Sequence, residues 1–273
     1  MPHVVVNGAR LWYEVRGSGE PILLHHGYTA SRVNWMPVAR RLESRYQVIL
    51  MECRGTGESE HTADGYTLEQ YAADVIGVAD HLGLQTFTYA GHSMGGGIGY
   101  VLALTYPERI KRLILMAAIP ADGIPGNAPM PVQPTPADHE TVLTRYKALR
   151  FRKDVETDDW LEDRVRHVTT VSSGHYTGGA ATMRTLAVGD RLGEVTMPTL
   201  IIAGAVDGLL PANLKDFARL PNATLQVFSF AGHEVAIHEP DGVAQAIDTF
   251  MQHGAVNAKT LQRQLVEAGL APR

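Results

Sequence analysis

A glycine-rich stretch in the middle of the chain has residue types and spacing suited to nucleophilic catalysis. Gly91-His92-Ser93-Met94-Gly95 lies between a short run of β-forming residues and an apolar segment of helical character. A serine on such a sharp strand-to-helix turn exposes its Oγ above the carboxyl edge of a sheet, and only small residues fit two positions before and after it. The pattern is also compatible with an ordinary glycine-rich turn.

A serine hydroxyl needs a base to remove its proton, and His233 has the position that fits this role. The chain has 12 histidines, so closeness in sequence cannot choose among them. His233 directly follows the last predicted strand, which places it at the same sheet edge as Ser93. A loop histidine without a catalytic role is the alternative, and His238 is expected at a helix start or on the surface.

Asp207 is the predicted partner of this histidine. It follows a buried strand at 199–203, shortly before Pro211 begins a helix, and there it would accept Nδ1–H of His233. A plain turn residue is the alternative. The oxyanion hole requires two backbone N–H donors, which we assign to Met94, after the serine, and to Tyr28, after the strand that ends at His25.

The elements that must position these residues alternate between β and α character. Strands are predicted at 4–6, 9–15, 22–25, 46–51, 112–117, 199–203 and 224–228, and helices at 31–45, 67–82, after Ser93, from Pro211 and at 243–252. The first two strands flank Asn7-Gly8, a signal for a type I′ hairpin. This alternation predicts an α/β fold with a mostly parallel central sheet and helices on both faces.

The alternation breaks between residues 120 and 190. Six prolines, at 120, 125, 129, 131, 134 and 136, precede helix-like segments around 137–150, 155–171 and 180–188. We therefore divide the chain into a core, 1–119 and 191–273, and a helical cap over the carboxyl edge of the sheet, 120–190. A closed pocket under this cap would take small to medium substrates rather than emulsified lipid. Its predicted lining residues are Tyr28, Trp35, Met130, Tyr146, Trp160 and Met183.

Composition narrows the classes of partner. Of the 273 residues, 45% are hydrophobic and 19% charged, and a net charge of -5 argues against nucleic acid. We find no membrane span, no signal peptide, no metal-ligand spacing and no cofactor fingerprint. The single cysteine, Cys53, suits a reducing cytoplasm. The C-terminal stretch 257–270 has apolar residues at helical spacing, most simply a docked helix, and a monomer or homodimer is expected.

Taken together, the chain resembles the α/β-hydrolase family, in particular its lidded branch of small esterases, lactonases, perhydrolases and carbon–carbon bond hydrolases. The resemblance covers most of residues 4–252. It rests on His26-Gly27, Arg54-Gly55-x-Gly57-x-Ser59, Gly91-His92-Ser93-Met94-Gly95-Gly96, Asp207, and Gly232-His233 with Glu239-Pro240. Two positions depart from the family pattern: Glu52 stands where aspartate is usual, and His25 precedes the His-Gly pair.

The resemblance implies a serine hydrolase of a small to medium carboxylic ester or lactone. A carbon–carbon bond hydrolase of diketones, or a perhydrolase, would use the same three residues and stays open. A ligand receptor with slow turnover is the alternative from a different class. Because Ser93 stands where halide- and epoxide-opening relatives carry aspartate, those two activities are disfavoured.

Overall fold

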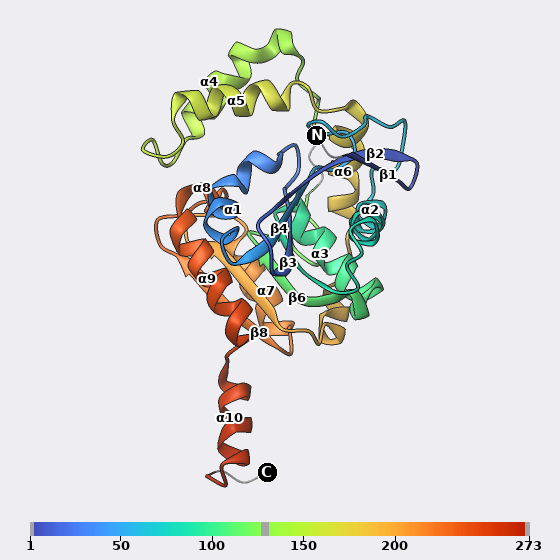
Figure 1. Cartoon of the computed structure of the whole chain (residues 1–273). Helices are drawn as coiled ribbons and strands as arrows, with labels where there is room; N and C mark the ends of the chain where they lie inside the picture. Colours follow the sequence, from blue (N-terminus) through green and yellow to red (C-terminus); the bar gives the residue numbers. More distant parts are fainter. Residues whose placement is uncertain (1–2, 127–130, 271–273) are drawn as a thin grey trace.

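The computed structural model describes residues 3–126 and 131–270 and is built around one eight-stranded sheet (Figure 1). Its strand order is β1-β2-β4-β3-β5-β6-β7-β8. The first three strands in this order pair antiparallel, and all other pairs are parallel. The predicted α/β class with a mostly parallel sheet is therefore confirmed. The strands are β1 His3–Val6, β2 Ala9–Arg16, β3 Glu20–His25, β4 Tyr46–Met51, β5 Phe87–His92, β6 Ile110–Met116, β7 Thr199–Gly204 and β8 Ala223–Phe228.

The predicted N-terminal hairpin is present. Asn7 and Gly8 have φ angles of 49° and 74°, the two positive values that a type I′ turn requires. The turn brings Val6 opposite Ala9. The hairpin then joins the parallel sheet through the antiparallel pair of β2 and β4.

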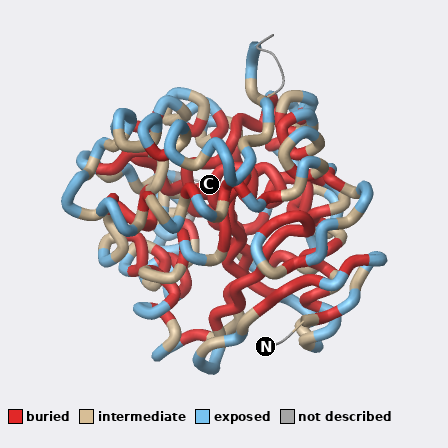
Figure 2. Tube along the Cα trace, turned by 90° about the horizontal axis from the view of Figure 1, so that it is seen from above, coloured by how far each residue is buried: buried red, intermediate tan, exposed pale blue. Residues whose placement is uncertain are grey.

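Helices cover both faces of the sheet, and alternate strand residues supply two separate cores. On β3, Leu23 belongs to the core under α2 and α3, whereas Ile22 and Leu24 belong to the core under α1 and α9. This is the period-2 alternation expected of a strand buried on both faces, and Figure 2 shows the buried segments running through the centre of the molecule. The body helices are α1 Met36–Leu42, α2 Leu68–His81, α3 Met94–Thr105, α7 Leu210–Arg219, α8 Val235–His238 and α9 Pro240–His253.

The helix predicted over 31–45 is divided in two. A short 3-10 turn, η1 at Arg32–Asn34, precedes α1, and Pro37 lies in the first turn of α1. Proline lacks an N–H and is tolerated only in that first turn, so the regular helix begins beside it. Further 3-10 turns are η2 Pro107–Arg109, η3 Pro136–Asp138 and η4 Gly189–Glu194.

The segment between β6 and β7, which we call the insertion (120–190), has no strand among its described residues. It contains α4 His139–Leu149, α5 Asp158–Val168 and α6 Ser173–Thr185. The α4 and α5 helices form a hairpin that stands above the body in Figure 1, whereas α6 packs against the body. The third helix was predicted too late, at 180–188, whereas α6 begins at Ser173 and includes Gly174 and Gly178. Both glycines allow α6 to approach Tyr66, where a Cβ at Gly174 would lie 2.2 Å from the ring.

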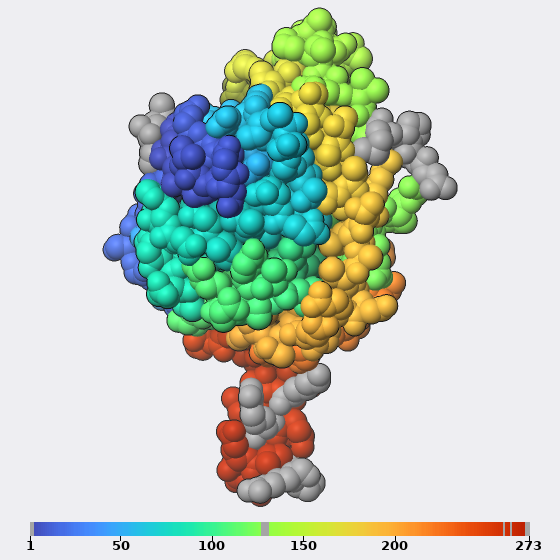
Figure 3. Space-filling view, turned by 90° about the vertical axis from the view of Figure 1, so that its right-hand side faces the viewer, coloured from blue at the N-terminus to red at the C-terminus, as the bar shows by residue number. Residues whose placement is uncertain are grey.

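The C-terminal helix α10, Ala258–Glu267, extends away from the body at the end opposite the insertion (Figures 1 and 3). Its start is attached to the body by Asn257 Nδ2, which donates to the carbonyl of Ala223 at 3.0 Å. The expectation of a docked helix was therefore wrong, because Leu261 remains exposed and Leu265 and Val266 are only half-buried. Among the described residues, no helix combines the length and apolar character that a membrane crossing requires.

Candidate active site

Ser93 occupies a strained turn between β5 and α3. Its backbone has φ 56° and ψ −115°, a conformation that residues other than glycine rarely adopt. The turn is fixed by the Ser93 N–H, which donates to Met116 O at 2.9 Å, and by the Ser93 carbonyl, which accepts from Gly96 N at 2.9 Å. A Cβ at Gly91 would lie 2.1 Å from Gly95 O, so the predicted requirement for small neighbours is met in the structure. Strain of this kind persists where the surroundings impose it.

The three residues expected to act together are joined by hydrogen bonds. His233 Nε2 lies 3.0 Å from Ser93 Oγ, and His233 Nδ1 lies 3.0 Å from Asp207 Oδ2. The second carboxylate oxygen, Asp207 Oδ1, accepts the N–H of Leu209 at 3.0 Å. Because the carboxylate holds Nδ1–H, the free lone pair of the ring belongs to Nε2 and points at the serine hydroxyl.

The electrostatics of the pair match this arrangement. Burial acts to lower the pKa of His233, but its hydrogen bond to Asp207 and the charge of that carboxylate outweigh burial and raise the pKa above its ordinary value. For Asp207, burial acts to raise the pKa of the carboxyl, and the hydrogen bond to His233 overcomes it and lowers the pKa. An ionised Asp207 beside a titrating imidazole is the state in which a histidine accepts and returns a proton near neutral pH.

The segments that carry the two predicted oxyanion donors converge on the serine. Met94 is the first residue of α3, so its N–H has no acceptor within that helix. Tyr28 lies in the loop after β3, and a Cβ at the preceding Gly27 would lie 2.9 Å from Ser93 Cβ. The glycine therefore allows the loop to pass directly beside the Ser93 side chain.

A cavity of about 770 Å³ opens between the insertion and His233. Tyr28, Tyr146 and Trp160, three of the predicted lining residues, border it. Trp35 and Met183 do not, and these two predictions were wrong. Both are core residues, since Trp35 is fully buried with Nε1 donating to His25 O at 2.9 Å, and Met183 packs into the core beside α3. Met130 lies outside the described residues.

A family model described as alpha/beta hydrolase fold matches residues 20–240 of the chain. The chain belongs to this family. The family resemblance inferred from the sequence is thereby confirmed. The match also supports the prediction that this protein is an enzyme of the alpha/beta hydrolase superfamily.

Among curated proteins, the chain is 29% identical to a non-heme haloperoxidase of Rhodococcus erythropolis over 92% of this chain and 100% of the relative. It is 27% identical to a putative carbamate hydrolase, RutD, of Caulobacter sp. (strain K31), over 88% of this chain and 95% of that protein. Its fold is similar to that of an enol-lactonase from Burkholderia xenovorans LB400, with a TM-score of 0.79 at 23% identity and coverage of 92% and 100%.

This member of the alpha/beta hydrolase fold family has a second carboxylate beside the histidine, which sequence reasoning did not single out. Glu234 borders the cavity next to His233, and its Oε2 accepts from Asn34 Nδ2 at 2.6 Å. Burial acts to raise the pKa of Glu234, but the charge of Arg164 and the bond from Asn34 help to lower it, so the group is ionised at neutral pH. The available signal was an acidic residue directly after the proposed base.

His92, the residue before the serine, supports the loop that carries His233. Burial lowers its pKa to about 4, so the ring is neutral, and its Nε2 donates to the backbone carbonyl of His233 at 2.9 Å. The ring centroids of His92 and His233 are 4.9 Å apart. His92 thus fixes the backbone of the residue that faces Ser93.

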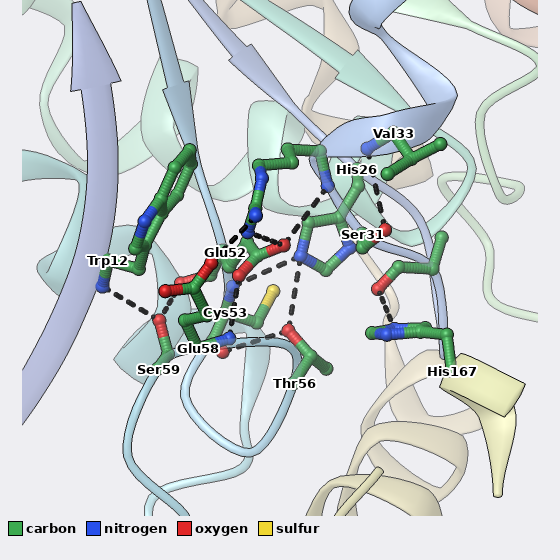
Figure 4. Close-up of polar contacts among 12 residues, drawn as sticks. Trp12, His26, Ser31, Val33, Glu52, Cys53, Thr56, Glu58, Ser59 and His167 are labelled. Atoms are coloured by element: carbon green, nitrogen blue, oxygen red, sulfur yellow. Dashed lines mark hydrogen bonds and ion pairs between the residues drawn. The ribbon is translucent and has the colours of Figure 1, made fainter. Parts of the chain in front are cut away.

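Glu52, the first of the two departures from the family pattern, belongs to the loop network of Figure 4. The buried Glu52 carboxylate accepts the N–H of Glu58 at 2.8 Å and pairs with Arg32 at 3.0 Å. Its longer side chain fills the space above Gly57, where a Cβ would lie 2.1 Å from Glu52 Oε2. His25 is fully buried and stacks on His26, with ring centroids 5.3 Å apart.

Proposed function

We propose that this protein is a serine hydrolase that cleaves small to medium carboxylic esters or lactones through an acyl-enzyme. The observation that carries the proposal is the continuous hydrogen-bonded chain from Ser93 through His233 to Asp207, with the serine on a strained turn. A serine in this setting is activated for attack by the histidine and returns to its resting state by the same route.

In the proposed reaction, Ser93 Oγ attacks the acyl carbonyl while His233 Nε2 takes the hydroxyl proton. Asp207 stabilises the resulting imidazolium. The N–H groups of Tyr28 and Met94 bind the tetrahedral oxyanion. His233 then gives its proton to the leaving alkoxide, and a water molecule, deprotonated by the same ring, hydrolyses the acyl-enzyme to release the acid.

The insertion, 120–190, is proposed to act as the cap that limits substrate size. The cavity combines aromatic walls, Tyr146, Tyr176 and Trp160, with the proposed reactive histidine. Its volume of about 770 Å³ lies in the range typical of small-molecule sites. A compact acyl or cyclic substrate would be enclosed, whereas an emulsified long-chain lipid needs an open apolar surface.

A second candidate function, perhydrolysis, is favoured by the name of one relative, the haloperoxidase of Rhodococcus erythropolis. In that reaction hydrogen peroxide would attack the acyl-enzyme in place of water. The bond from the acyl group to Ser93 would break, and the acyl group would be released as the peracid. The same three residues would serve, so acid and peracid formation are compared in one assay. Assaying acetate esters with and without peroxide separates the two functions.

Replacing Ser93 by alanine tests the proposal directly. Hydrolysis of a soluble aryl ester should fall by about 10⁴- to 10⁶-fold, as expected for loss of a serine nucleophile. An organophosphonate should add its mass to the peptide that carries Ser93 in the unmodified protein and to no peptide in the variant. Labelling at another residue, or an active Ser93→Ala protein, contradicts the assignment.

A substrate panel tests the size limit. Soluble short-chain esters and lactones should be hydrolysed far faster than an emulsified long-chain triglyceride, because the proposed cap would restrict access to the cavity. Equal specific activities on both would show that the insertion does not restrict access.

A further inference from the structure

The loop that carries the proposed oxyanion donor Tyr28 is held by the body on one side. His26 Nε2 accepts the N–H of Cys53 at 3.1 Å, and His26 Nδ1 donates to Gly27 O at 2.8 Å. Burial lowers the pKa of His26 well below its ordinary value, so the ring stays neutral with one donor and one acceptor. Figure 4 shows this ring facing the Cys53–Thr56 turn.

The same loop is held from the other side by the insertion. Arg164 of α5 donates to Thr29 O. His167 of α5 donates through Nε2 to Ala30 O at 2.8 Å (Figure 4). His175 of α6 accepts the Thr29 N–H at 3.4 Å through Nε2. Two helices of the insertion thus bond to three backbone groups of the loop, the N–H and carbonyl of Thr29 and the carbonyl of Ala30.

These bonds fall where the loop backbone is least stable by itself. Thr29 has a φ of 53°, which is unfavourable for a β-branched residue. Its N–H and its carbonyl are both bonded to the insertion. The Thr29 N–H belongs to the peptide that joins Thr29 to Tyr28, so these bonds hold the backbone directly beside the proposed Tyr28 donor.

The protonation states agree with these roles. Burial lowers the pKa of His175 to about 3, so the ring is neutral and its Nε2 lone pair is available to Thr29. Its Nδ1 lies 2.7 Å from Tyr71 Oη, which keeps the ring oriented. Burial also lowers the pKa of His167 to about 4. Neither ring loses its bond to the loop by titration near neutral pH.

We propose that Arg164, His167 and His175 are positioning residues for the oxyanion hole, through which the insertion takes part in catalysis as well as enclosing the substrate. This inference rests on the proposed function. It means that a displacement of α5 or α6 moves the Tyr28 donor, so the hole is complete only while the insertion is seated on the body.

The test compares His167→Leu, His167→Gln and Arg164→Met with Arg166→Met as a matched control. Arg166 lies on the same helix and pairs with Asp163, with side chains 69% and 72% exposed. Active sites are counted with a phosphonate carried to completion. For each variant, kcat per active site, KM and the affinity of a boronic acid, which forms a tetrahedral adduct with the serine, are measured.

We expect His167→Leu and Arg164→Met to lower kcat by about 10- to 100-fold with little change in KM, because a misplaced donor weakens the transition state more than the ground state. Boronic acid affinity should fall in parallel. His167→Gln keeps a donor near the Nε2 position and should recover most of the rate, and Arg166→Met should match the wild type.

Unchanged kcat per active site and unchanged boronic acid affinity in His167→Leu and Arg164→Met would overturn the inference. A lower melting temperature with normal kcat per active site would do the same, since it shows a role in folding alone. If His167→Leu does not fold, Arg164→Met decides. If the wild type neither hydrolyses esters nor labels at Ser93, the proposed function fails and this inference with it.

Discussion

The hairpin of α4 and α5 borders the cavity, and the turn at Ser93 is connected to it through His233, but the two regions are supported very differently. The turn lies between two cores that run along the sheet. A Cβ at Gly91 or Gly95 would collide with backbone oxygens, so little space is left around it. The α4–α5 hairpin has a small core of its own, Leu143, Leu161 and Val165, with Val142, Tyr146 and Trp160 packed around it. The proposed chemistry therefore takes place in a region packed between the two main cores. Access to it is controlled, in this proposal, by a hairpin that has a separate small core.

This difference indicates how one chain can combine a fixed catalytic geometry with an adaptable pocket. Regions with few buried apolar contacts open at lower free energy than the main core. The α6 helix connects the two regions, because Met183 on it and Leu186 directly after it join the core beside α3, while His175 bonds to the loop at Thr29. The comparison between the two regions can be tested at three levels.

The largest effect is expected at the catalytic edge. Asp207→Asn should fold but lower kcat by about 10⁴-fold, since the amide no longer holds Nδ1–H of His233 and the ring adopts the wrong tautomer. Circular dichroism and steady-state kinetics measure the two outcomes. Near wild-type activity would mean that another acid orients His233.

Leucine truncations compare the two cores directly. Leu115→Ala removes a fully buried side chain of β6 and should lower the free energy of unfolding by about 2–5 kcal/mol. Leu161→Ala, in the α4–α5 hairpin, should mainly increase hydrogen exchange of that hairpin and change the global free energy of unfolding less. Denaturant titration and hydrogen exchange measure both variants, and equal global losses would show that the hairpin unfolds with the main core.

The smallest effect concerns the pH dependence of activity. The rate should fall as pH drops through the raised pKa of His233, because a protonated ring cannot take the serine proton. Burial and the charge of Arg164 act to lower this pKa, and Asp207 and Glu234 raise it. The neutral ring of His92 lies close by, with its centroid 4.9 Å from that of His233. Glu234→Gln removes one negative charge, so the pKa falls and the acid limb of the profile should move to lower pH by less than about one unit. A shift to higher pH would contradict this electrostatic account.

Much of the fold was predictable because its signals are local. Asn7-Gly8 requires positive φ at two successive residues, and the glycines around Ser93 permit a turn that other residues would block. The candidate site was predictable in part for the same reason. Each of Ser93, Asp207 and His233 follows a parallel strand, and the carboxyl ends of such strands share one edge. The structure places the three side chains in contact there.

The amino-acid sequence by itself determined the family, the alternation of elements and the positions from which three reactive groups reach one sheet edge, because these depend on backbone conformation and strand order. Only the tertiary structure decided which large side chains border the cavity. Trp35 and Trp160 are equally apolar in sequence, yet one is buried under the sheet and the other borders the cavity. The contacts of Arg164, His167 and His175 with the loop at Thr29 and Ala30 could not be predicted from the sequence either. They join residues more than a hundred positions apart, through packing that no local pattern specifies.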